Sequence, residues 1–256
     1  MKFIILGCGS SMGVPRADGD FGNCDPKNKR NYRTRCSALL KTKSENILFD
    51  TSPDLRQQLI QNKITKIDKV FYSHMHADQT HGINDLRVFY IKRKKTVQAY
   101  ADKPTIKYLK SAFSYCFKSY NKEYPATIKL NKIKKRFLFK VCNKSFKINS
   151  ISVPHGKVNS ICYIINNKLA YVSDVSEIKK DYYKLFSNLK FLIIDCLWYR
   201  YHPSHLNLEK ILDLIKVIRP KKTILTNLHS DLDYNELNKK TPKNVVPAYD
   251  GLTINL

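Results

Sequence analysis

Short runs of hydrophobic residues recur along the chain and predict the strands of a sheet. Residues 2–7, 36–42 and 45–50 alternate between apolar and polar positions or run apolar, as strands do. The run 69–72 has the same character and leads into a histidine-rich stretch. Further strands are predicted at residues 136–141, 145–151, 160–166, 169–173, 190–195, 221–226 and 251–255.

Apolar positions at helical spacing predict helices between these strands. One helix begins at Leu55 after Pro53, a second spans residues 104–118, and a third starts near Asn207. Strands and helices alternate over residues 1–256 with no linker or internal repeat. This pattern predicts one α/β domain that is large enough for a layered core.

The composition favours a cytoplasmic protein without a membrane segment. The chain is 43% hydrophobic, and its most apolar windows, such as 191–198, are interrupted by charge. The apolar start ends at Gly7, too early for the core of a signal peptide. The seven cysteines form no CxxC pair and their number is odd, which fits a reducing compartment. They are Cys8, Cys24, Cys36, Cys116, Cys142, Cys162 and Cys196.

The net charge of +25 attracts polyanions such as nucleic acid, but its distribution marks no single binding site. Lysine is spread along the whole chain, with the densest basic runs at 92–95 and 132–136. A solvated basic surface is therefore favoured over a nucleic-acid interface. Charge alone does not choose a substrate.

The stretch 74–82 carries the strongest chemical signal in the sequence. His74, His76 and Asp78 follow a predicted strand at alternate positions, so their side chains can converge on one metal ion where the backbone curls into a loop or helical turn. The histidines outside this stretch lie in predicted loops that follow short apolar runs. They are His155, the pair His202 and His205, and His229.

These motifs resemble those of the metallo-β-lactamase superfamily, whose pattern is His-x-His-x-Asp-His followed by a later His, a later Asp and a final His. The resemblance implies a four-layer αβ/βα sandwich, in which two mixed sheets are flanked by helices. It also implies a centre that holds two divalent metal ions. By position, the first ion would be held by His74, His76 and His155, the second by Asp78 and His229, and Asp174 would bridge the two.

Within the superfamily, the segments 6–15, 81–87, 201–205 and 228–234 resemble the phosphodiesterase branch, in particular the PhnP-like phosphoribosyl cyclic phosphate diesterases. That branch implies cleavage of a small phosphodiester, open or cyclic, by a metal-bound hydroxide. The implied roles are a proton donor to the leaving oxygen for His205, its carboxylate partner for Asp195, substrate contact for His202, and both metal binding and catalysis for Asp78.

One position departs from the family pattern. Where the family has a histidine directly after the aspartate, this chain has Gln79, a neutral and weaker ligand than imidazole. We therefore expect two ions, zinc or manganese, with the second bound less tightly. His81 is a conceivable substitute, although related sequences carry a histidine there in addition to the ligand. A metal-binding protein without catalysis is the corresponding alternative.

Three other features have open interpretations. Asp50 stands where the family places a carboxylate that orients ligating histidines, but a turn or capping role also fits. The basic segment 30–35 can face a substrate phosphate, cap the sheet or form a subunit contact. The aromatic residues within 115–124 can form a base-stacking lid, although a core or interface role is favoured.

A tRNase Z-like endoribonuclease is the enzymatic alternative. The positive charge favours it, whereas the sequence has no glycine- and proline-rich arm of the kind that grips a tRNA. The resemblance also implies a homodimer that acts on a small phosphodiester, without a membrane partner. Some relatives bind a structural zinc on clustered cysteines after the first strand, but Cys24 alone occupies the corresponding segment, so we expect none.

Overall fold

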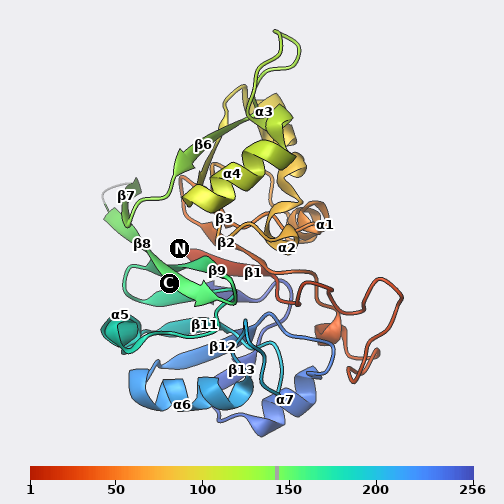
Figure 1. The fold of residues 1–256 in the computed structure, drawn as a ribbon, viewed down its shortest axis with the longest axis vertical. Helices are drawn as coiled ribbons and strands as arrows, with labels where there is room; N and C mark the ends of the chain where they lie inside the picture. Colours follow the sequence, from red (N-terminus) through yellow and green to blue (C-terminus); the bar gives the residue numbers. More distant parts are fainter. Residues whose placement is uncertain (142–143) are drawn as a thin grey trace.

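The computed structural model describes residues 1–141 and 144–256 (Figure 1), and Cys142 lies outside the described residues. Within them, the strands form two mixed sheets of seven strands each. The first sheet has the order β14 (Thr253–Asn255), β1 (Lys2–Gly7), β2 (Ser37–Lys41), β3 (Asn46–Phe49), β4 (Lys69–Phe71), β5 (Val97–Ala101) and β6 (Ile128–Lys132). The second has the order β13 (Val245–Pro247), β12 (Lys222–Thr226), β11 (Phe191–Asp195), β10 (Leu169–Val172), β9 (Val158–Ile165), β8 (Lys144–His155) and β7 (Arg136–Val141).

Helices cover the outer face of each sheet, so the predicted four-layer αβ/βα arrangement is confirmed (Figure 1). None of the helices that the structure describes is long and apolar enough to cross a bilayer. The helices on the side of the first sheet are α1 (Leu55–Gln61), α2 (Ala77–Thr80), α3 (Arg87–Arg93) and α4 (Lys103–Ala112). Those on the side of the second are α5 (Tyr183–Phe186), α6 (Leu208–Ile218) and α7 (Tyr234–Lys240).

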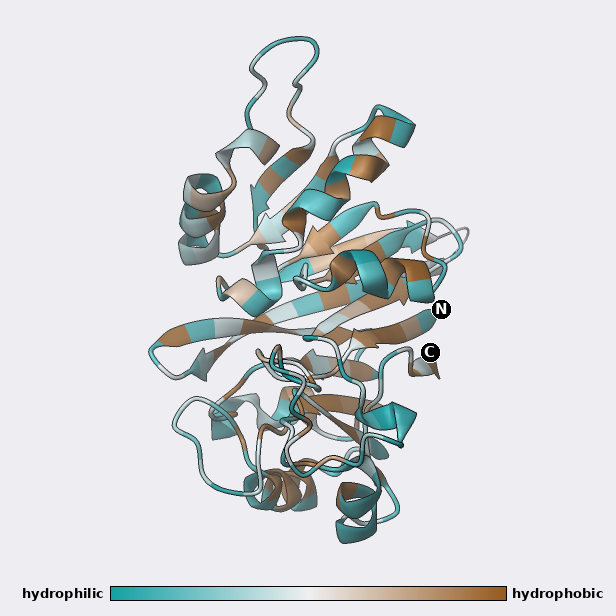
Figure 2. Ribbon diagram, turned by 90° about the vertical axis from the view of Figure 1, so that its right-hand side faces the viewer, coloured by the Kyte–Doolittle hydropathy of each residue, from teal (hydrophilic) through white to brown (hydrophobic). Residues whose placement is uncertain are grey.

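The alternation of side chains along each strand explains how one sheet serves two cores. Successive residues of a strand point to opposite faces. Phe3 of β1 therefore packs between the two sheets, whereas its neighbour Ile4 packs under the helices of the first sheet. In β11, Ile193 likewise lies between the sheets and Ile194 faces α6. Figure 2 shows many hydrophobic residues in the strands, whereas hydrophobic and hydrophilic residues alternate along the helices that cover them.

The strands with strong apolar patterns lie where they were predicted, and the differences have physical reasons. The helix predicted at 104–118 ends at Ala112, because Phe113 leaves the helical conformation with a φ of −130°. Strand β14 begins at Thr253 rather than at residue 251, because Gly251 has a positive φ of 86°. The sequence did not predict β5, β13 or β6, and in β6 lysine and asparagine alternate with the apolar residues.

The sheet topology places several loops at one edge of the sandwich. Strands β3 and β4 are parallel neighbours, as are β10, β11 and β12. Strand β8 pairs antiparallel to β9, which pairs antiparallel to β10, so β8 has the same direction as β10. The carboxyl ends of parallel strands are where open α/β sheets bind ligands. The residues that follow these strands therefore form the candidate site.

Replacement of Phe49 tests the core between the sheets. Phe49 is fully buried, and its ring centroid lies 5.0 Å from that of Tyr163 in the opposite sheet. We expect Phe49→Ala to lower the free energy of unfolding by about 3–5 kcal/mol, because it leaves a cavity between two sheets that cannot collapse onto it. Leu138→Ala is the control, since that side chain is 74% exposed. Urea denaturation followed by circular dichroism measures both, and equal losses would contradict the assignment of Phe49 to the core.

Candidate metal centre

His74 is held in place from both neighbouring strands. It lies three residues after the end of β4 and is buried. Its Nδ1 lies 3.0 Å from the hydroxyl oxygen of Ser73. The backbone N–H of Ser73 donates to Asp50 Oδ1 at 2.6 Å, and Asp50 follows β3 with a φ of 62°. Burial raises the pKa of Asp50 well above its ordinary value. Asp50 thus acts on His74 through Ser73.

His155 is the last residue of β8, and its hydrogen bond fixes the tautomer of its ring. Its Nδ1 lies 2.8 Å from the backbone carbonyl oxygen of Ser204. A carbonyl only accepts, so Nδ1 carries the proton and Nε2 of the neutral ring presents a lone pair. Gly156 permits this approach, because a Cβ at that position would lie 2.3 Å from the hydroxyl oxygen of Ser204.

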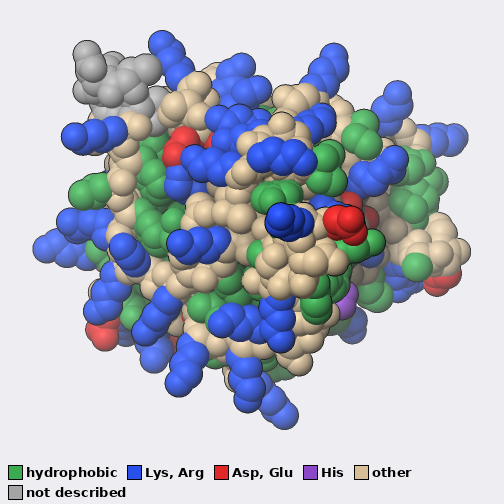
Figure 3. Space-filling model, turned by 90° about the horizontal axis from the view of Figure 1, so that it is seen from above, with side chains coloured by type: hydrophobic (Ala, Val, Ile, Leu, Met, Phe, Trp, Pro, Cys, Tyr) green, Lys and Arg blue, Asp and Glu red, His purple; other side chains and the backbone are tan. Residues whose placement is uncertain are grey.

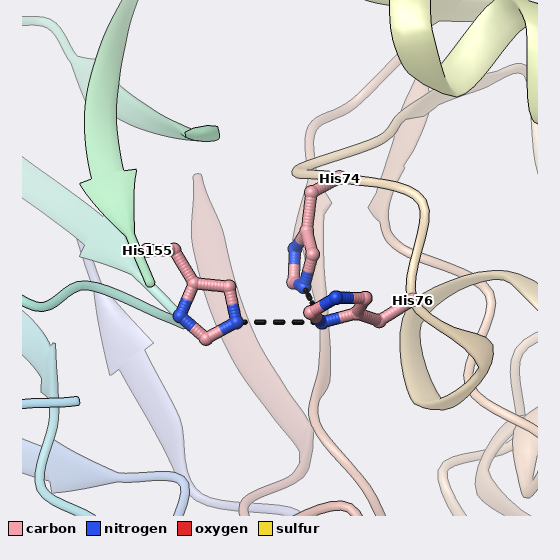
Figure 4. Close-up of side chains that lie close together, drawn as sticks. All are labelled: His74, His76 and His155. Carbon is pink, nitrogen blue, oxygen red and sulfur yellow. Dashed lines mark hydrogen bonds between the residues drawn. The ribbon is translucent and has the colours of Figure 1, made fainter. Parts of the chain in front are cut away.

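His74, His76 and His155, the three-histidine cluster, meet at one point (Figure 4). Nδ1 of His76 lies 2.9 Å from Nε2 of His74 and 3.3 Å from Nε2 of His155. Burial lowers the pKa of His74 to about 3 and also lowers that of His76, so both rings are neutral at pH 7. Neutral imidazoles are metal ligands, and catalytic zinc sites often have three protein ligands. The cluster fits a divalent ion.

His205 and Asp195 form a second unit beside the cluster. His205 Nδ1 donates to Asp195 Oδ2 at 2.7 Å. Burial alone would lower the pKa of His205, but the charge of Asp195 and this hydrogen bond raise it to about 9. The ring centroid of His205 lies 4.7 Å from that of His155. His205 is therefore protonated at neutral pH and stands next to His155, a candidate metal ligand.

Asn227 is the main site residue that sequence reasoning missed. Its amide nitrogen donates to Asp174 Oδ1 at 3.2 Å and to Asp195 Oδ1 at 3.1 Å. It is buried and follows β12 with a φ of 60°. The available signal was an amide side chain placed directly after a buried strand, where the other site residues also stand. Asn227 links the carboxylate of the proton-donor pair to the carboxylate predicted to bridge the metals.

The residues predicted for a second ion are not all brought together. Asp174 forms a group with His155 and His205 whose potential ligand atoms lie within 4.8 Å of one another. Within the described residues, His229 joins neither this group nor the three-histidine cluster. Its Nδ1 accepts the backbone N–H of Asp231 at 3.2 Å. The role of His229 as a ligand stays a prediction.

Two other histidines differ in their relation to the site. His202 packs beside His205, with ring centroids 5.0 Å apart. His81 lies away from the metal ligands: its Nε2 contacts the hydroxyl of Tyr108 at 2.7 Å, and its ring packs against Phe113. His81 is therefore not the substitute for the missing family histidine.

The basic segment 30–35 contacts neighbouring parts of the chain rather than facing a substrate. Arg33 is 2% exposed, and its guanidinium donates to the carbonyl oxygens of His229 and Leu232 at 3.2 and 2.7 Å. Arg35 pairs with Asp54 at 2.6 Å. Of the interpretations open from sequence, a structural role fits Arg33 and Arg35, whereas contact with a substrate phosphate does not.

The aromatic segment meets the core part of its favoured interpretation, as core or interface, only at Phe117, which packs against the core under the first sheet. Tyr115, Tyr120 and Tyr124 are all exposed, by 49%, 64% and 59%. They line a surface pocket around α3 together with Arg87. Packing in the core is thereby excluded for these three residues.

A cavity of about 270 Å³ connects the metal-binding and proton-donating groups. Its walls come from the loops after β1, β4, β8, β10, β11 and β12. The lining residues are Ser10, Ser11, Met12, His76, Asp78, His155, Asp174, Leu197, Trp198, His202, Ser204, His205, Asn227 and His229. One small volume therefore adjoins His205 and two members of the three-histidine cluster, His76 and His155.

Comparison with known proteins identifies the family of the chain. Residues 45–227 match the model of a family described as a beta-lactamase superfamily domain. Among solved structures, the chain is similar to a diphosphatase from the PhnP family, with a TM-score of 0.88, 28% identity and coverage of 100% of this chain and 97% of that chain.

Two curated relatives are longer than this chain. Over 258 residues it is 31% identical to an octanoyltransferase from Porphyromonas gingivalis, covering 98% of the chain and 51% of the relative. Over 154 residues it is 26% identical to a ribonuclease Z from Methanococcus maripaludis, covering 58% of the chain and 48% of the relative. The chain thus spans about half the length of the curated relatives that it matches.

Removal of one imidazole tests the three-histidine cluster. We expect His155→Ala to weaken zinc binding by at least about 100-fold, because even groups that only orient a ligand contribute about 10–100-fold. Competition with a chromophoric chelator measures the affinity. His81→Ala removes a histidine of the same stretch that contacts Tyr108 instead, and its affinity should match the wild type. Equal effects of the two substitutions would contradict the cluster as the site.

Asp195→Asn tests the cause of the raised pKa of His205. Burial lowers the pKa of His205, and without the charge of Asp195 less opposes this effect. The pKa of His205 should therefore fall from about 9 toward the ordinary value for histidine. Proton–carbon NMR of the histidine rings in the metal-free protein measures this titration. Asp213→Asn, which removes an exposed partner of Lys216, is the control and should leave it unchanged. A pKa that stays near 9 in Asp195→Asn would contradict the pairing.

Proposed function

The chain belongs to the beta-lactamase superfamily, and we propose that it is a metal-dependent hydrolase that cleaves a phosphodiester bond in a small substrate, open or cyclic. The observation that carries this proposal is the protonated His205–Asp195 pair, which adjoins the three-histidine cluster across one small cavity. Ester hydrolysis needs both parts: an activated water, and a proton for the leaving oxygen. The similarity to a diphosphatase of the PhnP family supports a phosphorus-containing substrate.

The metal ion and the chain divide the chemistry. His74, His76 and His155 would hold a divalent ion, which when bound would lower the pKa of a water and offset negative charge on a phosphoryl oxygen. His205 is protonated at neutral pH because of Asp195. Asp195 holds the proton on Nδ1, so the proton on Nε2 is the one transferred to the leaving oxygen. Asp195 then stabilises the orientation of the ring through the step.

His202 supplies a neutral donor to the same cavity. Burial, and then the charge of His205, lowers the pKa of His202, so its ring is neutral at pH 7. Its Nδ1 accepts the backbone N–H of Ser204 at 3.2 Å. The proton of the neutral ring is therefore on Nε2, which can donate to a phosphate oxygen. This arrangement supports the substrate contact expected for His202.

A ribonuclease of the tRNase Z type is the second candidate. The net charge of +25 and the match to a ribonuclease Z favour it. Figure 3 shows lysine and arginine side chains spread over the viewed face rather than gathered into one stripe, which favours a small substrate. An RNA gel shift at increasing salt separates the two, since binding through several phosphates weakens steeply with salt.

Acyl transfer through a cysteine has no support among the cysteines that the structure describes. The name octanoyltransferase belongs to a protein about twice as long. Each of the six cysteines that the structure describes is buried, and burial raises the pKa of each. The thiolate is the nucleophilic form. These residues therefore offer no cysteine suited to forming an acyl-enzyme.

Substrates with different leaving groups test the proposal and the role of His205 together. Metal-loaded protein should hydrolyse both a five-membered cyclic alkyl phosphodiester and bis(p-nitrophenyl) phosphate, and a chelator should abolish both activities. An alkoxide needs a proton to leave, whereas nitrophenolate leaves without one. We therefore expect His205→Gln to lower kcat by about 10²–10⁴-fold on the alkyl ester and far less on the aryl ester.

His81→Gln is the matched control for this experiment and should leave both activities unchanged. Equal losses on the two esters in His205→Gln would mean that His205 does not act as the acid. Absence of turnover of either ester by the metal-loaded wild type would overturn the proposed function itself.

A further inference from the structure

Gln79 occupies the space between two carboxylates that the family pattern assigns to a second metal ion. It lies in α2 and is fully buried. Its amide nitrogen donates to Asp78 Oδ2 at 3.1 Å and to Asp174 Oδ2 at 3.1 Å. Asp78 precedes it in α2, whereas Asp174 follows β10 in the other sheet. One amide group therefore bridges carboxylates from both halves of the sandwich.

The orientation of this amide follows from its surroundings. With the reverse orientation, the carbonyl oxygen of Gln79 would face two carboxylate oxygens, and no proton would lie between the three acceptors. The carbonyl oxygen instead points away and has no hydrogen-bond partner within the described residues. An NH₂ group has no lone pair for a cation. In this orientation, Gln79 supplies positive hydrogen atoms where a second ion would supply positive charge.

A second amide completes the enclosure of Asp174. Asn227 donates to its Oδ1 at 3.2 Å, while Gln79 donates to its Oδ2. A bridging carboxylate must offer lone pairs to both ions, and on each oxygen of Asp174 one of the two lone pairs already accepts an amide N–H. The remaining predicted ligand, His229, belongs to neither group of potential ligands among the described residues. The donor set of the second position therefore does not fit a metal ion.

We propose that Gln79 replaces the second metal ion: its amide bridges Asp78 and Asp174, and the chain binds one divalent ion, at the three-histidine cluster. The inference rests on the metal dependence of the proposed function but not on which bond is cleaved. The expected second, weakly bound ion is therefore absent from the proposed centre, which binds one ion.

A one-ion centre changes how the leaving oxygen is stabilised. Two-ion sites clamp both the attacking and the leaving oxygen between metals. With one ion, the second of these tasks falls to the chain, and His205 is the protonated group beside the cavity that can perform it. The two buried amides meanwhile satisfy the carboxylates without added charge.

Metal counting on three proteins tests the inference. Metal-free wild type, Gln79→His and Gln57→His are titrated separately with zinc and with manganese by calorimetry, and bound metal is measured by elemental mass spectrometry after dialysis. We expect one ion per chain in the wild type and two in Gln79→His, with affinity for the second ion raised by at least about tenfold, the lower end of what one partner in a metal site contributes. Gln57→His adds the same imidazole to an exposed position of α1 and should still bind one.

The outcomes are decisive in both directions. Two ions in the wild type with similar affinities, or one ion in a folded Gln79→His whose first ion binds normally, would overturn the inference. If Gln79→His does not fold, as judged by circular dichroism, the wild-type count still decides, and Gln79→Glu provides a second ligand-restoring variant. The count requires no substrate, so a protein that binds one ion but fails to hydrolyse phosphodiesters would overturn the proposed function while leaving this inference intact.

Discussion

The buried edge of the sandwich is governed by one electrostatic constraint: several carboxylates lie away from water, and each must be compensated. A buried carboxylate without hydrogen-bond donors or a counter-charge is strongly destabilising. The chain meets this requirement differently at each position, with a backbone N–H, an amide shared between two carboxylates, or a protonated imidazole. The carboxylates concerned are Asp50, Asp78, Asp174 and Asp195, and their partners are Ser73, Gln79, Asn227 and His205.

The same constraint explains why the two sheets cannot be considered separately from the site. The candidate ligands of the three-histidine cluster come from the loop between β4 and α2 on one side and from the end of β8 on the other. The aromatic core between the sheets, with Phe49 against Tyr163, fixes the distance between these contributions. The packing of this aromatic core thus positions the histidine side chains relative to one another. Arg33 stabilises this arrangement from the N-terminal loop through its hydrogen bonds to the carbonyl oxygens of His229 and Leu232.

Sequence predicted what local patterns encode. Strongly apolar runs marked β1, β4 and β11, and the spacing of His74 and His76 marked the metal-binding stretch, because both signals lie within a few residues. Partners far apart in the chain could not be predicted in this way: Gln79 meets Asp174 across 95 residues, and Asn227 meets it across 53. The direction in which an amide turns depends on its neighbours in space. For the same reason, composition alone left the role of Arg33 open, since a buried and a surface arginine look alike in sequence.

The hydrogen bond from His155 to the carbonyl of Ser204 has a consequence for how this centre can change during evolution. Ser204 directly precedes His205, so a single short contact ties a candidate metal ligand, His155, to the proposed proton donor. A substitution that shifts His155 or His205 to suit a bulkier substrate also shifts the other residue. Gly156 restricts substitution at this contact further, because any side chain there would collide with Ser204. New specificity is therefore more readily acquired at an exposed residue of the cavity lining such as Met12, which takes no part in this hydrogen bond.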